Sequence, residues 1–200
     1  MIFMGIDTSG DHDVTTPYVL SLVISNDSKS IEESNLGECI QEIRNLLGKE
    51  NYVLHATNDS EKVRKSVVQV IEKYDIKSMI IVVLDRVKVN KKSLGKILKG
   101  VVNADLVVYD NEILDGVKIA RKMFKVSLSK HGKSPISIPL QIADYFSYYW
   151  WEFFSGKLKD VNSFEKILSM TIKIFIVGYE RELTFVNTSL SHLRFNAHTY

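Results

Sequence analysis

The sequence predicts an α/β protein in which helices cover both faces of a mixed, five-stranded sheet. Two observations predict this class. Short apolar runs rich in β-branched residues recur along the chain and are bounded by polar residues, which is typical of strands. Between most of these runs lie longer segments in which apolar residues return every three or four positions, which is typical of amphipathic helices. Such alternation favours parallel pairing of the later strands, because a helical crossover brings the chain back to start again at the same end of the sheet.

Five segments are predicted to be strands. Residues 1–7 and 17–25 flank a short polar loop and should form a hairpin. The other three strands are residues 52–55, 79–84 and 106–109. We expect the strand order 3-2-1-4-5. In that order the first, third, fourth and fifth strands run the same way, so their carboxyl ends meet at one edge of the sheet, where α/β proteins hold their ligands.

Apolar periodicity predicts helices over residues 31–47, 63–74, 90–101, 116–128 and 140–154. The last of these carries aromatic side chains on all sides between residues 145 and 154, so a single sheet is too small to cover it. We expect residues 1–155 to form one domain. Residues 156–200, with a helix at 163–170 and a strand at 172–177, should be an extension that packs on this domain or at a dimer interface. A homodimer would form through the aromatic helix, residues 145–154, or through this extension.

The composition is that of a soluble globular protein: of the 200 residues, 45% are hydrophobic and 25% are charged. The longest uninterrupted apolar run, residues 79–84, is far shorter than the ~20 residues of a membrane span. The first residues also lack the basic start of a signal peptide. Cys39 has no second cysteine to pair with, which excludes an internal disulfide and a cysteine-based metal site. We therefore expect a cytoplasmic protein.

Positive charge is concentrated in two segments, residues 86–104 and 116–143, which contain no acidic residue. In the second segment the basic residues from 118 to 125 have the spacing of one helix face. A solvated helix face is the commoner reason for such a run. Because two basic segments lie beside candidate acidic residues, however, we favour a polyanionic partner. The residues predicted to contact nucleic acid are Lys92, Lys96, Lys118, Arg121, Lys122, Lys125, His131 and Lys133.

Four carboxylates are candidates for a shared site. Asp7, Asp85 and Asp110 each follow a predicted strand, and Asp144 lies among apolar residues in a predicted helix. A single such aspartate is more often a cap or a turn residue. A buried charge, however, must be paired, neutralised or bound to a cation. Because neighbouring strands are ~4.8 Å apart, the expected strand order places Asp85 next to Asp7 and Asp110 about two strands away.

Carboxylates that converge in this way favour Mg²⁺ or Mn²⁺. Two such ions can activate water and stabilise the leaving oxygen of a phosphodiester, which is the two-metal route to nucleic-acid cleavage. His55 ends a predicted strand and is a candidate metal ligand or proton carrier, with a structural role as the alternative. The candidate catalytic residues are Asp7, Asp85, Asp110, Asp144 and His55, with the four aspartates as candidate metal ligands.

Four short motifs suggest a family. They are Ile-Asp-Thr-Ser-Gly-Asp at residues 6–11, Leu-His-Ala at 54–56, an aspartate after Leu-Val-Val-Tyr at 106–109, and Leu-Gln-Ile-Ala-Asp-Tyr at 140–145. Together they resemble a widespread uncharacterised family with an RNase H-like fold, domain of unknown function 3800. The resemblance covers about residues 1–154, and the last motif is the most specific of the four.

The resemblance implies an RNase H-like acidic centre in which Asp7, Asp110 and Asp144 are the matching positions and His55 matches the middle motif. It therefore favours Asp110 where the strand order favours Asp85, and both remain candidates. The chain departs from the family at Thr8, which replaces a glutamate, and at Val53, which replaces an acid. We predict a divalent-metal-dependent nuclease or related phosphodiester-processing enzyme. The alternative is a catalytically inactive module that binds nucleic acid or a protein partner.

Overall fold

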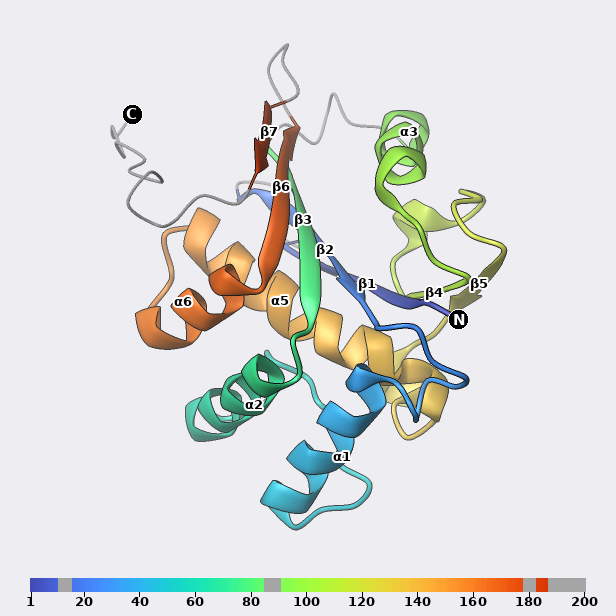
Figure 1. Ribbon diagram of the computed structural model, residues 1–200. Coiled ribbons are helices and arrows are strands. Elements are labelled where there is room, and N and C mark those ends of the chain that lie inside the picture. Colours follow the sequence, from blue (N-terminus) through green and yellow to red (C-terminus); the bar gives the residue numbers. More distant parts are fainter. Residues whose placement is uncertain (11–15, 85–90, 178–182, 187–200) are drawn as a thin grey trace.

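The computed structural model (Figure 1) describes residues 1–10, 16–84, 91–177 and 183–186. Its strands span Phe3–Ser9 (β1), Tyr18–Ile24 (β2), Lys77–Val83 (β3), Leu106–Tyr109 (β4), Lys122–Lys125 (β5), Thr171–Val177 (β6) and Leu183–Val186 (β7). In the described residues they form one sheet in the order β5-β4-β1-β2-β3-β6-β7. β2 runs antiparallel to β1 and β3, whereas β1 with β4, β4 with β5, and β3 with β6 pair in parallel. The carboxyl ends of β1, β3, β4, β5 and β6 therefore lie at one edge of the sheet.

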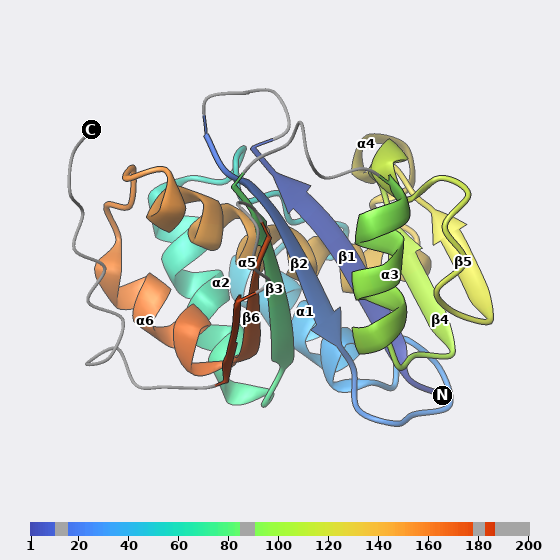
Figure 2. The ribbon, with the colours of Figure 1, turned by 90° about the horizontal axis from the view of Figure 1, so that it is seen from above.

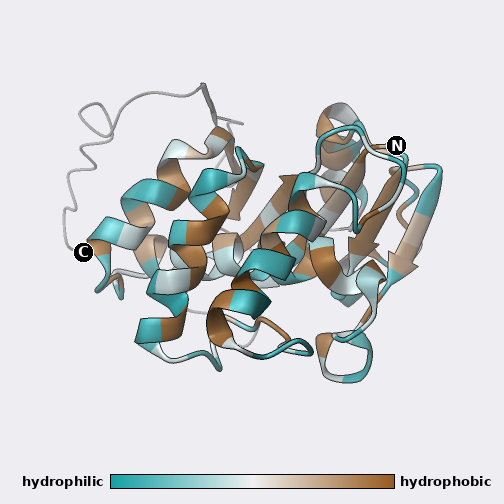
Figure 3. Cartoon of the chain, turned by 60° about the horizontal axis from the view of Figure 1, so that its bottom comes forward, coloured by the Kyte–Doolittle hydropathy of each residue, from teal (hydrophilic) through white to brown (hydrophobic). Residues whose placement is uncertain are grey.

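Helices cover both faces of this sheet (Figure 2). Those with ends defined by the structure are Asn35–Leu47 (α1), Glu61–Lys73 (α2), Lys91–Val101 (α3), Leu128–His131 (α4), Ile138–Phe154 (α5) and Val161–Ser169 (α6), with short 3-10 turns at Glu112–Leu114 and Pro135–Ser137. Helices α1, α2, α5 and α6 share a core with one face of the sheet, and α3 shares a core with the other. In Figure 3, α1 and α2 carry alternating hydrophilic and hydrophobic residues, as expected of helices with one buried side. None of the described helices is long and apolar enough to cross a membrane.

The predicted α/β class, with a mixed sheet and helices on both faces, is confirmed, but the strand order needs a correction. Residues 52–55 are a loop, and Lys77–Val83 takes the place beside β2 that was predicted for them. Leu106–Tyr109 takes the place beside β1 that was predicted for residues 79–84. The loop replaces a strand because its backbone N–H groups bond to side chains: Leu54 donates to Gln141, and His55 donates to Asp59. The sheet also contains strands that were not part of the predicted order: β5 extends it past β4, and β6 and β7 extend it past β3.

The predicted helix at 116–128 is also wrong, since residues 122–125 form the edge strand β5. Backbone pairing with β4 has overridden a weak helical period. Consequently the basic side chains from Lys118 to Lys125 do not share a helix face. Lys125 instead forms an ion pair with Asp115, with 2.8 Å between Lys125 Nζ and Asp115 Oδ2. Lysines on an edge strand discourage pairing with other chains.

Helix α5 packs so closely on the sheet that its backbone lies against the backbone of β1. A Cβ atom added to Gly5 of β1 would lie 2.0 Å from the carbonyl oxygen of Pro139, so only glycine fits there. One turn later, Ser21 Oγ of β2 donates a 2.6 Å hydrogen bond to the carbonyl of Ala143. These contacts fix the rotation and height of α5 above the ends of β1 and β4.

The C-terminal segment supplies the cover that the aromatic part of α5 requires. Trp150 is buried, and its Nε1 donates to Thr171 Oγ1 of β6 at 3.1 Å. Phe164 of α6 stacks on Phe153, with 4.7 Å between the ring centres. A homodimer through this helix stays a prediction.

Candidate active site

Asp7 and Asp110 lie at the ends of two neighbouring parallel strands. Ile6 of β1 is opposite Tyr109 of β4, so the next residue on each strand is an aspartate. Alternation along a strand directs both aspartates to the side that α5 covers, because Gly5 and Val108, two positions earlier, face the start of α5. Asp7 is buried and Asp110 is half-buried.

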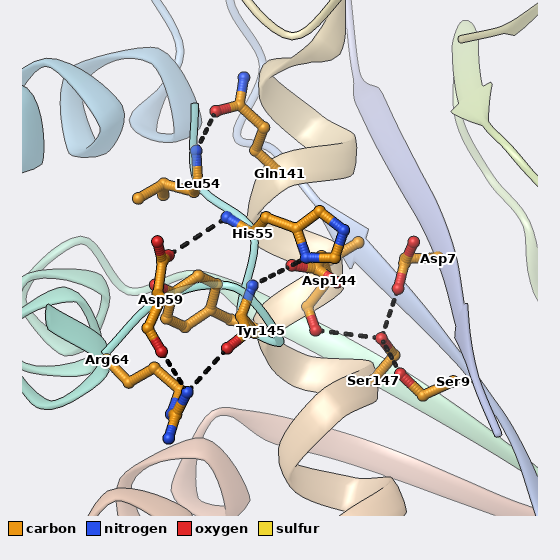
Figure 4. A network of polar contacts seen from close by, with 12 residues as sticks. Asp7, Ser9, Leu54, His55, Asp59, Arg64, Gln141, Asp144, Tyr145 and Ser147 are labelled. Atoms are coloured by element: carbon orange, nitrogen blue, oxygen red, sulfur yellow. Dashed lines mark hydrogen bonds and ion pairs between the residues drawn. The ribbon is translucent and has the colours of Figure 1, made fainter. Parts of the chain in front are cut away.

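Asp144 reaches the same place from α5. It is buried, and its Oδ2 accepts a 2.5 Å hydrogen bond from the backbone N–H of Ala56. His55 Nδ1 lies 3.8 Å from the same oxygen and has no hydrogen-bond partner among the described residues, although this atom is buried (Figure 4). A buried nitrogen beside a carboxylate can exchange a proton with it or share a cation with it.

The carboxylates act on one another electrostatically. Burial raises the pKa of Asp7 well above its ordinary value, and the charges of Asp144 and Asp110 raise it further, against hydrogen bonds from Ser147 and Thr8. Burial likewise raises the pKa of Asp144 to about 6, although His55 and the Ala56 N–H lower it and the charges of Asp110 and Asp59 raise it. Simultaneous ionisation of these carboxyl groups is therefore unfavourable unless a cation is bound.

Ser147 connects Asp7 with α5. Its Oγ lies 2.5 Å from Asp7 Oδ2, to which it donates, 3.0 Å from the carbonyl oxygen of Asp144 and 3.0 Å from Ser9 Oγ. Figure 4 shows Ser147 between Asp7 and the backbone of Asp144. This serine fixes the orientation of Asp7, a role that the sequence did not reveal.

The loop at residues 52–59 carries His55 and is held at both ends by buried side chains. Gln141 accepts a hydrogen bond from the N–H of Leu54 at 2.9 Å. Asp59 accepts hydrogen bonds from the N–H of His55 at 3.2 Å and from the hydroxyls of Tyr52 and Tyr145. Neither anchor was predicted: Gln141 appeared only as part of a motif, and Asp59 precedes Ser60, the residue that caps α2.

A cavity of about 1010 Å³ lies at the candidate site. Asp7, Asp110, Asp144 and His55 all contribute to it. Thr8 lines the cavity too, and its Oγ1 accepts a hydrogen bond from Asn111 Nδ2 at 2.9 Å. The position at which the resembling family has a glutamate therefore faces the same space. Val53, the other departure, also lines the cavity.

The donor set fits a hard divalent cation in its chemistry. Among the described residues, no group of three or more His, Cys, Asp or Glu side chains is placed so that it could hold a metal ion. Two observations nevertheless favour a cation: the charges of neighbouring carboxylates raise the pKa of Asp7 and of Asp144, and the buried His55 Nδ1 has no hydrogen-bond partner among the described residues. A cation would relieve both.

The other predicted site residues that the structure describes do not line this cavity. Asp85 lies outside the described residues, and the neighbour argument that favoured it is wrong, because β2 lies between β1 and β3. Lys92 and Lys96 are exposed on α3, on the opposite face of the sheet from α5. The remaining predicted nucleic-acid contacts are exposed side chains outside the cavity lining: Lys118, Arg121, Lys122, Lys125, His131 and Lys133.

No protein-family model and no curated protein sequence matches this chain. Among solved structures it is similar to a chain of the PCNA:RNase HII complex from Archaeoglobus fulgidus, with a TM-score of 0.48 and 14% identity over 82% of this chain and 79% of that chain. It is also similar to ribonuclease H2 from Pyrococcus horikoshii OT3, with a TM-score of 0.47 and 12% identity over 82% of this chain and 78% of that chain.

Proposed function

We propose that the protein is a divalent-metal-dependent nuclease or a related phosphodiester-processing enzyme. One observation carries the proposal: Asp7 of β1, Asp110 just after β4 and Asp144 of α5 line one cavity, where the charges of Asp144 and Asp110 raise the pKa of Asp7 and the charge of Asp110 raises the pKa of Asp144. Structural ion-pair networks also perturb pKa values, but there the carboxylates face Lys or Arg. The groups that perturb these aspartates are mainly other acids, burial and His55.

Asp7, Asp110 and Asp144 would hold Mg²⁺ or Mn²⁺, with Asp85 as a further candidate. When bound, such ions supply an activated water and charge stabilisation for the leaving oxygen. Ser147 would hold the Asp7 carboxylate in place through its 2.5 Å hydrogen bond. His55 Nδ1 either joins the ligands or carries a proton beside Asp144. The loop anchored by Asp59 and Gln141 holds the histidine in place for either role.

Cleavage assays test the proposal. Labelled single-stranded DNA, RNA and DNA–RNA hybrid are incubated with the protein and Mn²⁺ or Mg²⁺, beside the double variant Asp7→Asn, Asp144→Asn. We expect metal-dependent cleavage that the double variant loses by at least about 100-fold. Asp75→Asn is the matched control, because this exposed aspartate is far from the cavity lining and asparagine tolerates its positive φ of 49°. Cleavage that survives in the double variant contradicts the proposal.

The second candidate is a catalytically inactive module that binds nucleic acid or a protein partner. Thr8 and Val53 favour it, because both line the cavity where the resembling family carries acids. This alternative predicts salt-dependent binding of nucleic acid without cleavage, and binding that Mn²⁺ does not alter. Isothermal titration with Mn²⁺ separates the two, since an inactive module that has lost its cation site gives no heat of binding.

A further inference from the structure

The cavity has a second wall whose chemistry differs from that of the carboxylates. Tyr148 and Trp151 follow Asp144 on α5 at four and seven positions, which places all three on one side of the helix, and all three line the cavity. The helical rise puts Tyr148 about one turn, ~6 Å, and Trp151 about two turns, ~10 Å, beyond Asp144 along the axis. Lys157, just after the end of α5, also lines this part of the cavity. We call Tyr148, Trp151 and Lys157 the aromatic wall.

Both aromatic rings are held in fixed positions. The guanidinium of Arg64 lies 5.1 Å from the centre of the Tyr148 ring, and the Tyr148 hydroxyl donates to Glu152 Oε1 at 2.7 Å. Trp151 Nε1 donates to Thr16 Oγ1 at 3.3 Å, and Lys157 Nζ lies 4.6 Å from the Trp151 ring centre. A ligand that contacts these rings therefore loses little side-chain entropy on binding.

Core packing covers only part of each ring, since Tyr148 and Trp151 pack against the core and are still partly exposed. Tyr145, Phe146, Tyr149 and Trp150 occupy the other sides of α5 and are at most 1% exposed, whereas Tyr148 and Trp151 are only half-buried. The end of β1 also approaches Trp151 closely: a Cβ atom added to Gly10 would lie 2.6 Å from Trp151 Nε1. The aromatic wall thus stands beside the strand that carries Asp7. An aromatic surface with a lysine, adjoining a group of carboxylates in one cavity, suits a ligand with a planar ring and a phosphate.

We propose that the aromatic wall is a subsite for an unpaired nucleotide, with the base stacked on Tyr148 or Trp151 and a backbone phosphate beside Lys157. This inference rests on the proposed function, because the neighbouring phosphodiester would then face Asp7, Asp110 and Asp144. Aromatic stacking recognises bases of a single strand, whose faces are accessible, whereas bases inside a duplex are already stacked on each other. The preferred substrate is therefore single-stranded nucleic acid or a frayed end.

Equilibrium binding of a fluorescent oligothymidylate in EDTA tests the subsite without cleavage. We expect the double variant Tyr148→Ala, Trp151→Ala to weaken binding by roughly 5- to 150-fold, the effect of losing one stacked base. Its dependence on salt should stay unchanged. Lys157→Ala should instead make affinity less dependent on salt: the negative slope of log affinity against log salt should become smaller in magnitude by about 0.7. Phe124→Ala, which removes an exposed aromatic ring of β5 outside the cavity lining, is the control and should bind as the wild type does.

Two further measurements distinguish loss of the subsite from misfolding of the variants. Tyr148→Phe and Trp151→Phe keep the rings and should retain binding within about threefold. In the unaltered protein, oligothymidylate should quench tryptophan fluorescence and Trp151→Phe should abolish the quenching, because Trp150, the other tryptophan, is 1% exposed. Equal affinity for an abasic strand of the same length, tighter binding of a blunt duplex, or unchanged binding by the folded alanine variant would each overturn the subsite.

The outcomes also separate the subsite from the proposed nuclease activity. If the wild type binds oligothymidylate through the aromatic wall but never cleaves, the nuclease proposal fails and the subsite stands. If the wild type cleaves and the folded alanine variant binds and cleaves equally well, the subsite fails and the nuclease proposal stands.

Discussion

Asp7 and Asp144 are buried among apolar side chains, and burial raises the pKa of both carboxyl groups. In the absence of a cation, the ionised forms oppose folding, since each charge lacks the hydration that it has in the unfolded chain. Side chains that reduce stability in this way are common at functional sites, where a ligand later compensates for them. Two predictions follow from the charges of these residues.

Replacing Asp144 by asparagine should stabilise the cation-free protein at neutral pH. The folded-state pKa of Asp144, about 6, lies above its ordinary value of 3.8, so its contribution to stability is fully present below about pH 4 and is lost as the pH rises through about 6. Asparagine keeps an oxygen for the Ala56 N–H but carries no charge. The variant should therefore gain on the order of 1–3 kcal/mol over the wild type at about pH 8 and nothing at about pH 4.

Urea unfolding in EDTA across this pH range measures the difference, with Asp75→Asn as the control. A variant that is less stable than the wild type at about pH 8 would show that Asp144 is stabilised in its charged form.

Divalent cations should raise the melting temperature of the wild type. A cation at 100 times its dissociation constant stabilises the folded state by about 2.7 kcal/mol, which for a chain of this size corresponds to about 5–10 °C. Differential scanning fluorimetry with Mn²⁺ and Mg²⁺ checks this. Asp7→Asn and Asp110→Asn should lose most of the shift. An equal shift in these variants would place the binding of the cation elsewhere.

Helix α5 is the element on which the site is built. It supplies Asp144 and Ser147 to the carboxylates, and it supplies Gln141 to the loop that carries His55. This is possible because the N-terminal part of α5 lies against the backbone of β1 at Gly5, with no side chain between them. A wider separation would move Asp144 away from the strand ends that carry Asp7 and Asp110.

Gly5→Ala should therefore disrupt both the fold and the site. The new methyl carbon would lie 2.0 Å from the carbonyl oxygen of Pro139, and backbone atoms have little freedom to move away. We expect a loss of at least about 3 kcal/mol in the free energy of unfolding. Gly100→Ala in α3 is the matched control. Its Cβ meets nothing within 4 Å, so alanine should stabilise the helix by up to about 1 kcal/mol. Similar unfolding curves for the two variants would mean that α5 tolerates a wider separation.

At the scale of the whole molecule, the sheet continues into the C-terminal segment. β6 pairs with β3, α6 stacks Phe164 on Phe153, and Lys166 of α6 forms an ion pair with Glu72 of α2. The candidate site lies at the other part of the sheet, between β1, β4 and α5, and receives none of these contacts. The segment thus supports α5, and it also contributes Lys157 to the lining of the cavity.

A chain of residues 1–155 should fold poorly for this reason. It would expose Trp150, the ring of Phe153 and the backbone edge of β3 to solvent, which favours aggregation. Size-exclusion chromatography and circular dichroism compare it with the full chain. A shortened chain that stays monomeric and unfolds cooperatively at the same temperature would support an independent domain over residues 1–155.

The sequence by itself determined the elements whose signals are local. Apolar runs located β1 to β4, helical periods located α1, α2, α3 and α5, and the apolar setting of Asp144 identified it as a candidate, because these patterns depend on neighbours within a few residues. Strand pairing is different, since a strand can pair with any other. Only the tertiary structure placed Leu106–Tyr109, the strand that precedes Asp110, next to the strand that carries Asp7.

The conformation of the loop at residues 52–59 and the position of the aromatic wall also depend on the tertiary structure. Leu54 bonds to Gln141, 87 residues away, so no local pattern distinguishes this loop from a strand. Tyr148 and Trp151 resemble the core aromatics beside them in sequence. Whether a ring enters the core or borders a cavity depends on what the rest of the chain packs against it, and that is a property of the folded molecule.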